Sequence, residues 1–251
     1  MFRTVKMTDV GNGRINNQDS YLLKECFCHG KQVILAAMCD GMGGLKRGER
    51  ASSFVVNSLE RWFDEKVFDS ISKKVKMKTI KKELITVIRS MNQKLILMGR
   101  TYGDSMGTTL TLLFGMGHDF FVLNIGDTRA YWFEDERMFV TKDHTLVEEE
   151  VRLGHLTRQE ARMDRRRHIL VQCLGVTKEI QIDCYQGKLK EGMSFLLCTD
   201  GFYNRLEEEE LYQVPKDKEQ MKCWVREMMS TVKARGELDN LSCMVVKVEV
   251  S

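Results

Sequence analysis

The sequence lacks the features that mark several common protein classes. It contains one proline, Pro215, and no internal repeat, which excludes proline-rich linkers and solenoid architectures. No apolar run approaches the ~18 residues that a membrane helix requires. The N-terminal stretch MFRTVKMTDVGNGR lacks the apolar region of a signal peptide. We therefore expect a single domain over residues 1–251 that is soluble, cytoplasmic and not bound to a membrane.

Charge and cysteine content exclude further classes. The 39 basic and 36 acidic residues leave a net charge of only +3, so nothing indicates a nucleic-acid-binding surface. The eight cysteines show no regular spacing, and several lie inside apolar runs, where a thiol behaves as a small hydrophobe. Cys26, Cys28 and His29 lack a second ligand cluster that would complete a zinc site. We expect a monomer with reduced cysteines and, with 43% apolar residues, a substantial core.

Apolar periodicity predicts strands interleaved with amphipathic helices. Helical spacing indicates three helices, at 48–63, 80–98 and 221–233, and two short charged ones at 146–153 and 157–163. Strands are predicted at 21–26, 33–39, 108–114, 119–125, 129–133, 137–140, 180–188, 193–198 and 241–248. This order is typical of a layered architecture in which helices cover sheets.

Four aspartates stand where predicted strands begin or end. Asp40 and Asp200 each follow an apolar run and precede a glycine, Asp239 precedes the last strand, and Asp127 lies in the turn of NIGDTRAY. One such aspartate is usually an ordinary turn residue. If the strands are neighbours, however, the four carboxylates converge, and like charges that close require a cation among them.

The donor atoms indicate which cation. All candidates are oxygen ligands with no matching histidine, which favours Mg²⁺, Mn²⁺ or Ca²⁺ over zinc or copper. Gly41 has no side chain, so its carbonyl can approach a metal closely. Two such ions would lower the pKa of a bridging water for attack on phosphorus. Arg14 could hold phosphate oxygens with its planar fork, although an exposed loop arginine is the alternative interpretation.

The ordered motifs resemble the bacterial type-2C family of metal-dependent Ser/Thr protein phosphatases. They run along nearly the whole chain: RINNQDS (14–20), CDGMGG (39–44), MGTTL (106–110), NIGDTRAYW (124–132), TKDHTLVEEEVRLGHLT (141–157), CTDGFYNRL (198–206) and DNLS (239–242). The resemblance implies an α+β fold, a four-layer α-β-β-α sandwich of two antiparallel sheets flanked by helices. It also implies hydrolysis of phosphoserine and phosphothreonine in phosphorylated proteins by a metal-bridging water, opposing a bacterial Ser/Thr kinase.

The resemblance also assigns roles to individual residues. Asp40 would bridge two Mn²⁺ or Mg²⁺ ions, to which Gly41 would contribute its carbonyl. The remaining roles are metal binding by Asp200 and Asp239, a weaker third ion at Asp127, a metal-bound water at Asp19 and substrate phosphate at Arg14. The segment 143–175 resembles the flap beside the active site of this family.

Three departures from the family pattern qualify these roles. Met42 stands where animal members carry a histidine, so we name no general acid. Asn204 replaces an aspartate of many members, and its neutral amide predicts a weaker third site. Gln18 stands where glutamate is frequent, which leaves the two-metal core untouched. The sequence decides neither the substrate protein nor the preference between Mn²⁺ and Mg²⁺.

Other segments admit two interpretations. The alternative function is a non-catalytic regulator that binds phosphoproteins, against which the intact carboxylates argue. The basic cluster Asp164–His168 is either a solvated helix end or a surface that attracts acidic phosphopeptides. GDSMGTTL lacks the lysine of a nucleotide-binding loop, so Thr108 and Thr109 are expected to pack near the metal site. His144 and His155 are expected to be the only histidines near the site, and His144 is expected to be a turn or flap residue, with a catalytic acid as the alternative.

Overall fold

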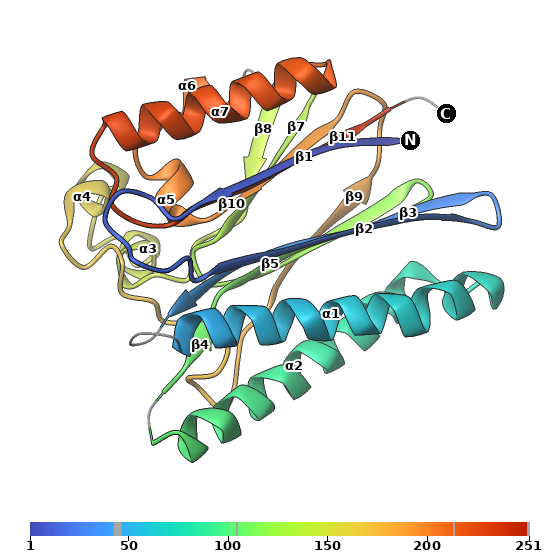
Figure 1. Cartoon of the computed structure of the whole chain (residues 1–251), viewed down its shortest axis with the longest axis horizontal. Coiled ribbons are helices and arrows are strands. Elements are labelled where there is room, and N and C mark those ends of the chain that lie inside the picture. Colours follow the sequence, from blue (N-terminus) through green and yellow to red (C-terminus); the bar gives the residue numbers. More distant parts are fainter. Residues whose placement is uncertain (43–46, 104, 213, 250–251) are drawn as a thin grey trace.

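Two antiparallel sheets pack face to face, with helices on their outer faces (Figure 1). The computed structural model describes residues 1–42, 47–103, 105–212 and 214–249. The predicted α+β architecture of helices over two sheets is confirmed.

The first sheet takes most of its strands from the N-terminal half of the chain. Its strand order is β2 (Asp19–Cys28), β3 (Lys31–Met42), β5 (Leu110–Met116), β6 (Asp119–Ile125) and β9 (Asp183–Lys188), and the short β4 (Gly107–Thr108) pairs with the end of β3. The long helices α1 (Arg47–Ser72) and α2 (Met77–Thr101) cover its outer face (Figure 1). Helix α1 extends past its predicted end at residue 63 because Val67 and Ile71 continue its buried stripe.

The second sheet joins the two ends of the chain. Its order is β1 (Phe2–Asp9), β11 (Leu241–Val248), β10 (Ser194–Cys198), β7 (Arg129–Glu134) and β8 (Arg137–Val140), and α7 (Lys218–Ala234) covers it. The short helices α5 (Asp200–Tyr203) and α6 (Glu208–Leu211) follow β10. Strand β1 was not predicted, since it is a half-exposed edge strand interrupted by Arg3 and Lys6.

The space between the sheets is filled by large side chains from both inner faces. Phe120 packs edge-on against Phe195 with ring centroids 5.0 Å apart, and Ile34, Met38 and Met244 are fully buried in the same cluster. This inner core fixes how the strands of one sheet lie over those of the other. The ends of β3, β10 and β11 therefore have a defined spatial relationship.

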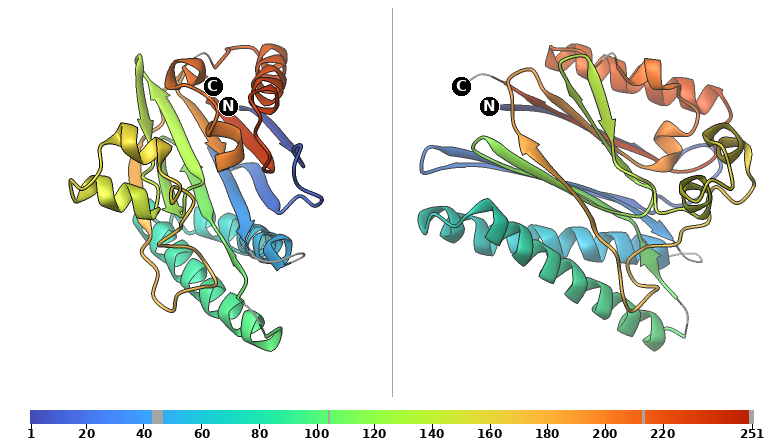
Figure 2. Two further views of the ribbon diagram at one scale, coloured as in Figure 1. Left: turned by 90° about the vertical axis from the view of Figure 1, so that its left-hand side faces the viewer. Right: turned by 180° about the vertical axis from the view of Figure 1, so that it is seen from behind.

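The predicted flap forms a separate projection with two short helices, α3 (Leu146–Arg152) and α4 (Arg158–Met163). Thr157 and Glu160 form a reciprocal capping box at the start of α4. Isolated bridges between Thr145 and Leu170, and between Thr108 and Leu174, close the base of this segment. Figure 2 shows its yellow helices standing out from the sheets, and Figure 1 places them at the same end of the molecule as α5.

Candidate active site

Asp19 and Asp40 lie directly opposite each other in the β2–β3 ladder, at the end of the first sheet. Beyond Asp40 the strand continues through Gly41 to Met42, which pair with β4. A Cβ on Gly41 would lie 2.2 Å from the carbonyl oxygen of Gly48 and 2.7 Å from that of Gln18. Only glycine therefore fits here. Gly43 and Gly44 of the motif lie outside the described residues.

Two threonines fix the main chain of Asp40. The Asp40 N–H donates to Oγ1 of Thr109 at 2.9 Å, and the Asp40 carbonyl accepts from the Thr109 N–H at 2.9 Å and from Oγ1 of Thr108 at 2.8 Å. The hydroxyl of Thr109 also contacts that of Thr128. Thr108 and Thr109 thus lie beside Asp40, as the sequence predicted.

Asp200 and Asp239 come together because β10 and β11 are neighbours in the second sheet. Asp200 begins α5, directly after β10, and a Cβ on Gly201 would lie 3.3 Å from the Cβ of Asp239. Thr199 joins this pair to the first sheet, since its Oγ1 donates to Oδ2 of Asp19 at 3.0 Å. The strand ends of both sheets therefore meet at one end of the sandwich.

Arg14 reaches the same place from the N-terminal loop. Its Nε donates to Oδ1 of Asp239 at 2.8 Å and its Nη2 donates to Oδ2 at 2.7 Å, so the guanidinium grips both carboxylate oxygens. The loop packs closely on the chain beside Asp239, where a Cβ on Gly11 would lie 1.9 Å from the Asp239 carbonyl oxygen. The Gly13 N–H donates to the carbonyl of Leu238 at 3.1 Å.

The pKa values show that these carboxyl groups share one electrostatic environment. Burial raises the pKa of Asp19 to about 7, with the charges of Asp200 and Asp239 adding to the effect and the hydroxyls of Ser242 and Thr199 opposing it. Burial, then Asp19 and Asp200, hold the pKa of Asp40 well above its usual range.

Asp127 lies deeper in the same region, in the turn between β6 and β7. It is 8% exposed, and its carbonyl accepts a hydrogen bond from the Tyr203 hydroxyl at 2.9 Å. Burial, then the charge of Asp200, raises the pKa of Asp127 well above its usual range. All predicted site residues are therefore found near one another, at one end of the molecule.

Comparison with known proteins accounts for this arrangement. The family model of protein phosphatase 2C matches residues 12–245, nearly the whole chain. The chain belongs to the protein phosphatase 2C family. The protein phosphatase PhpP of Streptococcus pneumoniae is 29% identical over 245 residues, which cover 96% of each protein. The resemblance that the motifs suggested is confirmed, and so is the enzyme class.

Two solved structures share the fold at similar identity. The serine/threonine phosphatase of S. agalactiae superposes with a TM-score of 0.87 at 27% identity, over 99% of this chain and 100% of that one. The catalytic domain of the phosphatase PstP, solved in complex with two manganese ions, gives a TM-score of 0.81 at 26% identity over 99% of each chain. Across the residues that the structure describes, no helix of this phosphatase is long and apolar enough to cross a membrane.

The residues of this 2C-type phosphatase fit hard divalent ions. Oδ1 of Asp19 is buried and, within the described chain, has no hydrogen-bond partner. Burial, with the neighbouring carboxylates adding to it, raises the pKa values of Asp19, Asp40 and Asp127, so a cation among them would favour their charged forms. In the described ranges, no group of three or more His, Cys, Asp or Glu side chains is placed to hold a metal ion. The candidate donors are carboxylate and carbonyl oxygens, which are the ligands that Mg²⁺ or Mn²⁺ takes together with water.

The flap approaches the site through residues that the sequence did not single out. Arg129 on β7 grips both oxygens of Asp143, at 2.8 and 2.7 Å, and its Cζ lies 3.8 Å from the ring centroid of Tyr203. These contacts fix the start of the flap next to Asp127. Asn204 donates from Nδ2 to Oδ2 of Asp200 at 3.3 Å, so this departure from the family pattern also lies at the site.

The expectation about histidines was wrong in one respect. A third histidine, His168 in the flap, approaches the carboxylates, with its Nδ1 3.6 Å from Oδ2 of Asp200. The sequence placed His168 only in a basic cluster. His155 instead contacts Glu150 at 2.9 Å, and Nδ1 of the buried His144 accepts from the Gly126 N–H at 3.3 Å.

Asn240 is a second residue that sequence reasoning missed. Its Nδ2 donates to the carbonyls of Val10 and Asn16, at 2.8 and 3.1 Å, and its Oδ1 accepts from the Gln18 N–H at 2.9 Å. Asn240 therefore holds both ends of the loop that carries Arg14. The available signal was its place directly after Asp239 in the DNLS motif.

Proposed function

We propose that this chain hydrolyses phosphoserine and phosphothreonine in proteins with two Mn²⁺ or Mg²⁺ ions. The ligands would be the carboxylates of Asp40, Asp200 and Asp239 and the carbonyl of Gly41. When bound, the ions supply a water activated for in-line attack on phosphorus and neutralise charge on the phosphoryl oxygens. The observation that carries this proposal is the meeting of distant strand-end carboxylates with an arginine fork at one end of the sandwich.

Asp19 and Arg14 have distinct roles in this proposal. Thr199 donates to Oδ2 of Asp19, which leaves the buried Oδ1 to accept a hydrogen bond from a water in the site. Arg14 is half exposed and its fork matches two oxygens of a phosphate. Because that fork is on Asp239 in the structure, substrate binding requires Arg14 to release at least one of these two hydrogen bonds.

Asp127 would contribute to a weaker third ion. Its carboxyl group is buried beside Asp200, but the neighbouring Asn204 brings an amide where a second negative charge would help to hold a cation. We expect this site to fill only at metal concentrations above those that fill the other two. Met42 offers no proton to the leaving oxygen, so no general acid is assigned.

The proposed cellular role is based on the names of related bacterial proteins. Bacterial relatives across the family bear the names serine/threonine phosphatase and protein phosphatase, which supports phosphorylated proteins as substrates and opposition to a Ser/Thr kinase. We also propose that the enzyme acts in the cytoplasm as a monomer. No observation favours the alternative of a non-catalytic regulator, since Asp40, Asp200 and Asp239 are all present.

An activity assay tests the proposal. The chain is expected to hydrolyse p-nitrophenyl phosphate and a phosphothreonine peptide with Mn²⁺, and to lose this activity in chelator. The variant Asp239→Asn should reduce turnover strongly, whereas the matched variant Asp69→Asn, on the far part of α1, should not. No turnover with any divalent ion would favour the binding regulator, whereas turnover that persists in chelator would contradict the metal mechanism.

A further inference from the structure

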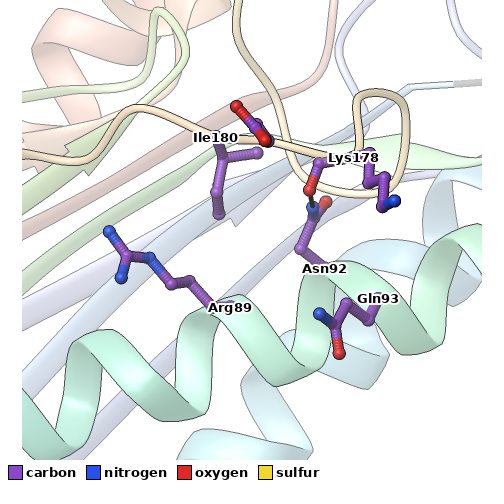
Figure 3. A pocket seen from close by; sticks show the side chains of 6 residues that line it. Arg89, Asn92, Gln93, Lys178 and Ile180 are labelled. Atoms are coloured by element: carbon purple, nitrogen blue, oxygen red, sulfur yellow. Dashed lines mark hydrogen bonds between the residues drawn. The ribbon is translucent and has the colours of Figure 1, made fainter.

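Helix α2 buries one amide side chain, Asn92, among residues that are otherwise apolar or glycine. Asn92 is 1% exposed, and its Oδ1 accepts from the Gly175 N–H at 2.7 Å. Its Nδ2 donates to the carbonyls of Thr177 at 2.8 Å and Lys178 at 3.3 Å. All three hydrogen bonds thus reach one short backbone segment. Figure 3 shows Asn92 rising from α2 toward this segment, at a depression of about 280 Å³.

That segment is the C-terminal root of the flap. Leu174 exchanges two backbone hydrogen bonds with Thr108, at 2.9 and 3.0 Å. Gly175 has a φ of +89°, and a Cβ there would lie 2.2 Å from the carbonyl oxygen of Met106 and 3.1 Å from the Cβ of Leu95. The flap root is therefore clamped between α2 on one side and the chain entering β4 on the other.

Thr108 also contacts Asp40, a residue of the proposed metal site. Oγ1 of Thr108 donates to the Asp40 carbonyl at 2.8 Å, and the N–H of Thr109 donates to that carbonyl at 2.9 Å. A continuous path of short contacts therefore runs from Asn92, through the flap root and Thr108, to the main chain of Asp40.

We propose that Asn92 is a positioning residue that fixes the flap root and, through Leu174 and Thr108, the main chain of Asp40. An apolar side chain would fill the same space on α2 without the cost of burying an amide. Both polar atoms of the Asn92 side chain have partners, and all of these partners lie on the flap root. Contiguous hydrogen bonds between packed elements are the means by which such coupling is carried. The part that concerns ion binding rests on the proposed function.

Three variants test this role. Asn92→Ala removes all three hydrogen bonds. Asn92→Asp keeps the acceptor for the Gly175 N–H but turns a carboxylate oxygen toward two carbonyls, and it serves if the alanine variant does not fold. Gln93→Ala is the matched control, because Gln93 is exposed and lines the same depression, and its side chain makes no hydrogen bond to the described part of the chain.

Two measurements are made on each variant. In the metal-free protein, amide hydrogen exchange should become faster at 172–178 and at 105–110 in both Asn92 variants. The exchange rate in the strand at 33–39 should not change. Mn²⁺ affinity by calorimetry should fall about fivefold, within the range for mutations along such networks. The Gln93→Ala control should match the wild type in both.

The outcomes separate this proposal from the proposed function. Faster exchange confined to 172–178, with unchanged Mn²⁺ affinity, would reduce Asn92 to a local anchor and overturn the positioning role. If the wild type binds no Mn²⁺, the proposed function fails. The exchange at 105–110 then still decides whether Asn92 fixes the chain next to Asp40.

Discussion

Arg14 and Asp239 lie 225 residues apart in the sequence, and the guanidinium of the first holds both carboxylate oxygens of the second. This pair joins the N-terminal loop to the start of the last strand at the site. The two proposed roles compete with this pairing, because Asp239 is proposed to bind a metal ion and Arg14 a substrate phosphate.

Replacing Arg14 by lysine separates these roles. Lysine keeps the positive charge but loses the fork, so catalytic efficiency on a phosphothreonine peptide should fall about 10- to 100-fold, the worth of a charge-assisted hydrogen bond. The Mn²⁺ concentration for half activation should stay the same or decrease, because Asp239 is held less firmly. A weakened Mn²⁺ requirement without a loss of efficiency would contradict a role in phosphate binding. Arg3→Lys, on the edge strand β1, is the control.

The pH dependence of stability tests the state of Asp19 in the metal-free protein. Its pKa is about 7 in the folded chain against an ordinary value of 3.8, so the folded form keeps a proton that the unfolded chain releases. This contribution to the free energy of unfolding is fully present below pH 4 and is lost as the pH rises from there through 7. Thermal melts in chelator should show this loss.

The variant Asp19→Asn isolates that contribution. The asparagine side chain cannot titrate, so the free energy of unfolding of the variant should change less between pH 4 and 7 than that of the wild type. Parallel curves for the two proteins would show that Asp19 does not hold the proton. Groups remote from the site titrate alike in both proteins and cancel in the difference, whereas Asp40, whose pKa Asp19 helps to raise, contributes to it.

Asn240 should be needed for the loop that carries Arg14. Asn240→Ala removes three hydrogen bonds to Val10, Asn16 and Gln18, and should lower the free energy of unfolding by about 1–3 kcal/mol. It should also lower catalytic efficiency at temperatures where the protein is fully folded, since Arg14 is then less well placed. Asn57→Ala, exposed on α1, is the matched control. A destabilised variant with unchanged efficiency would assign Asn240 to the fold alone.

The basic cluster in the flap should act on protein substrates only. Arg165 and Arg166 are exposed beside the site, and Arg166 is engaged by Asp164 at 2.8 Å. Changing Arg165–Arg167 to alanine should leave p-nitrophenyl phosphate turnover unchanged and weaken turnover of acidic phosphoproteins, most clearly at low salt. The control is the double variant Lys66→Ala, Lys82→Ala, whose changes lie on α1 and α2. Equal losses on both substrates would assign the cluster a structural role.

The strand-end carboxylates could be predicted because their signal is local. Asp40 and Asp200 each follow an apolar run and precede glycine, so the sequence shows both the strand and its end. The edge strand β1 gave no such signal, because its charged residues alternate with half-buried ones. Local pattern thus predicted the central strands and the carboxylates that they carry.

Residues that act through distant backbone could not be predicted. Asn92 reads as a polar position on an amphipathic helix, and only the fold brings Gly175, 83 residues later, against it. Asn240 reads as a turn residue for the same reason. The side chain of His168 approaches Asp200 because the flap folds back, which no spacing in the sequence encodes.

The most direct test of the central claim is a crystal of this protein soaked in manganese and measured at the manganese absorption edge. A two-metal site would give two anomalous peaks that share the carboxylate of Asp40, with Asp200 and Asp239 on one of the ions. Manganese bound elsewhere, or Asp239 still held by Arg14 with no ion beside Asp40 at saturating manganese, would contradict it.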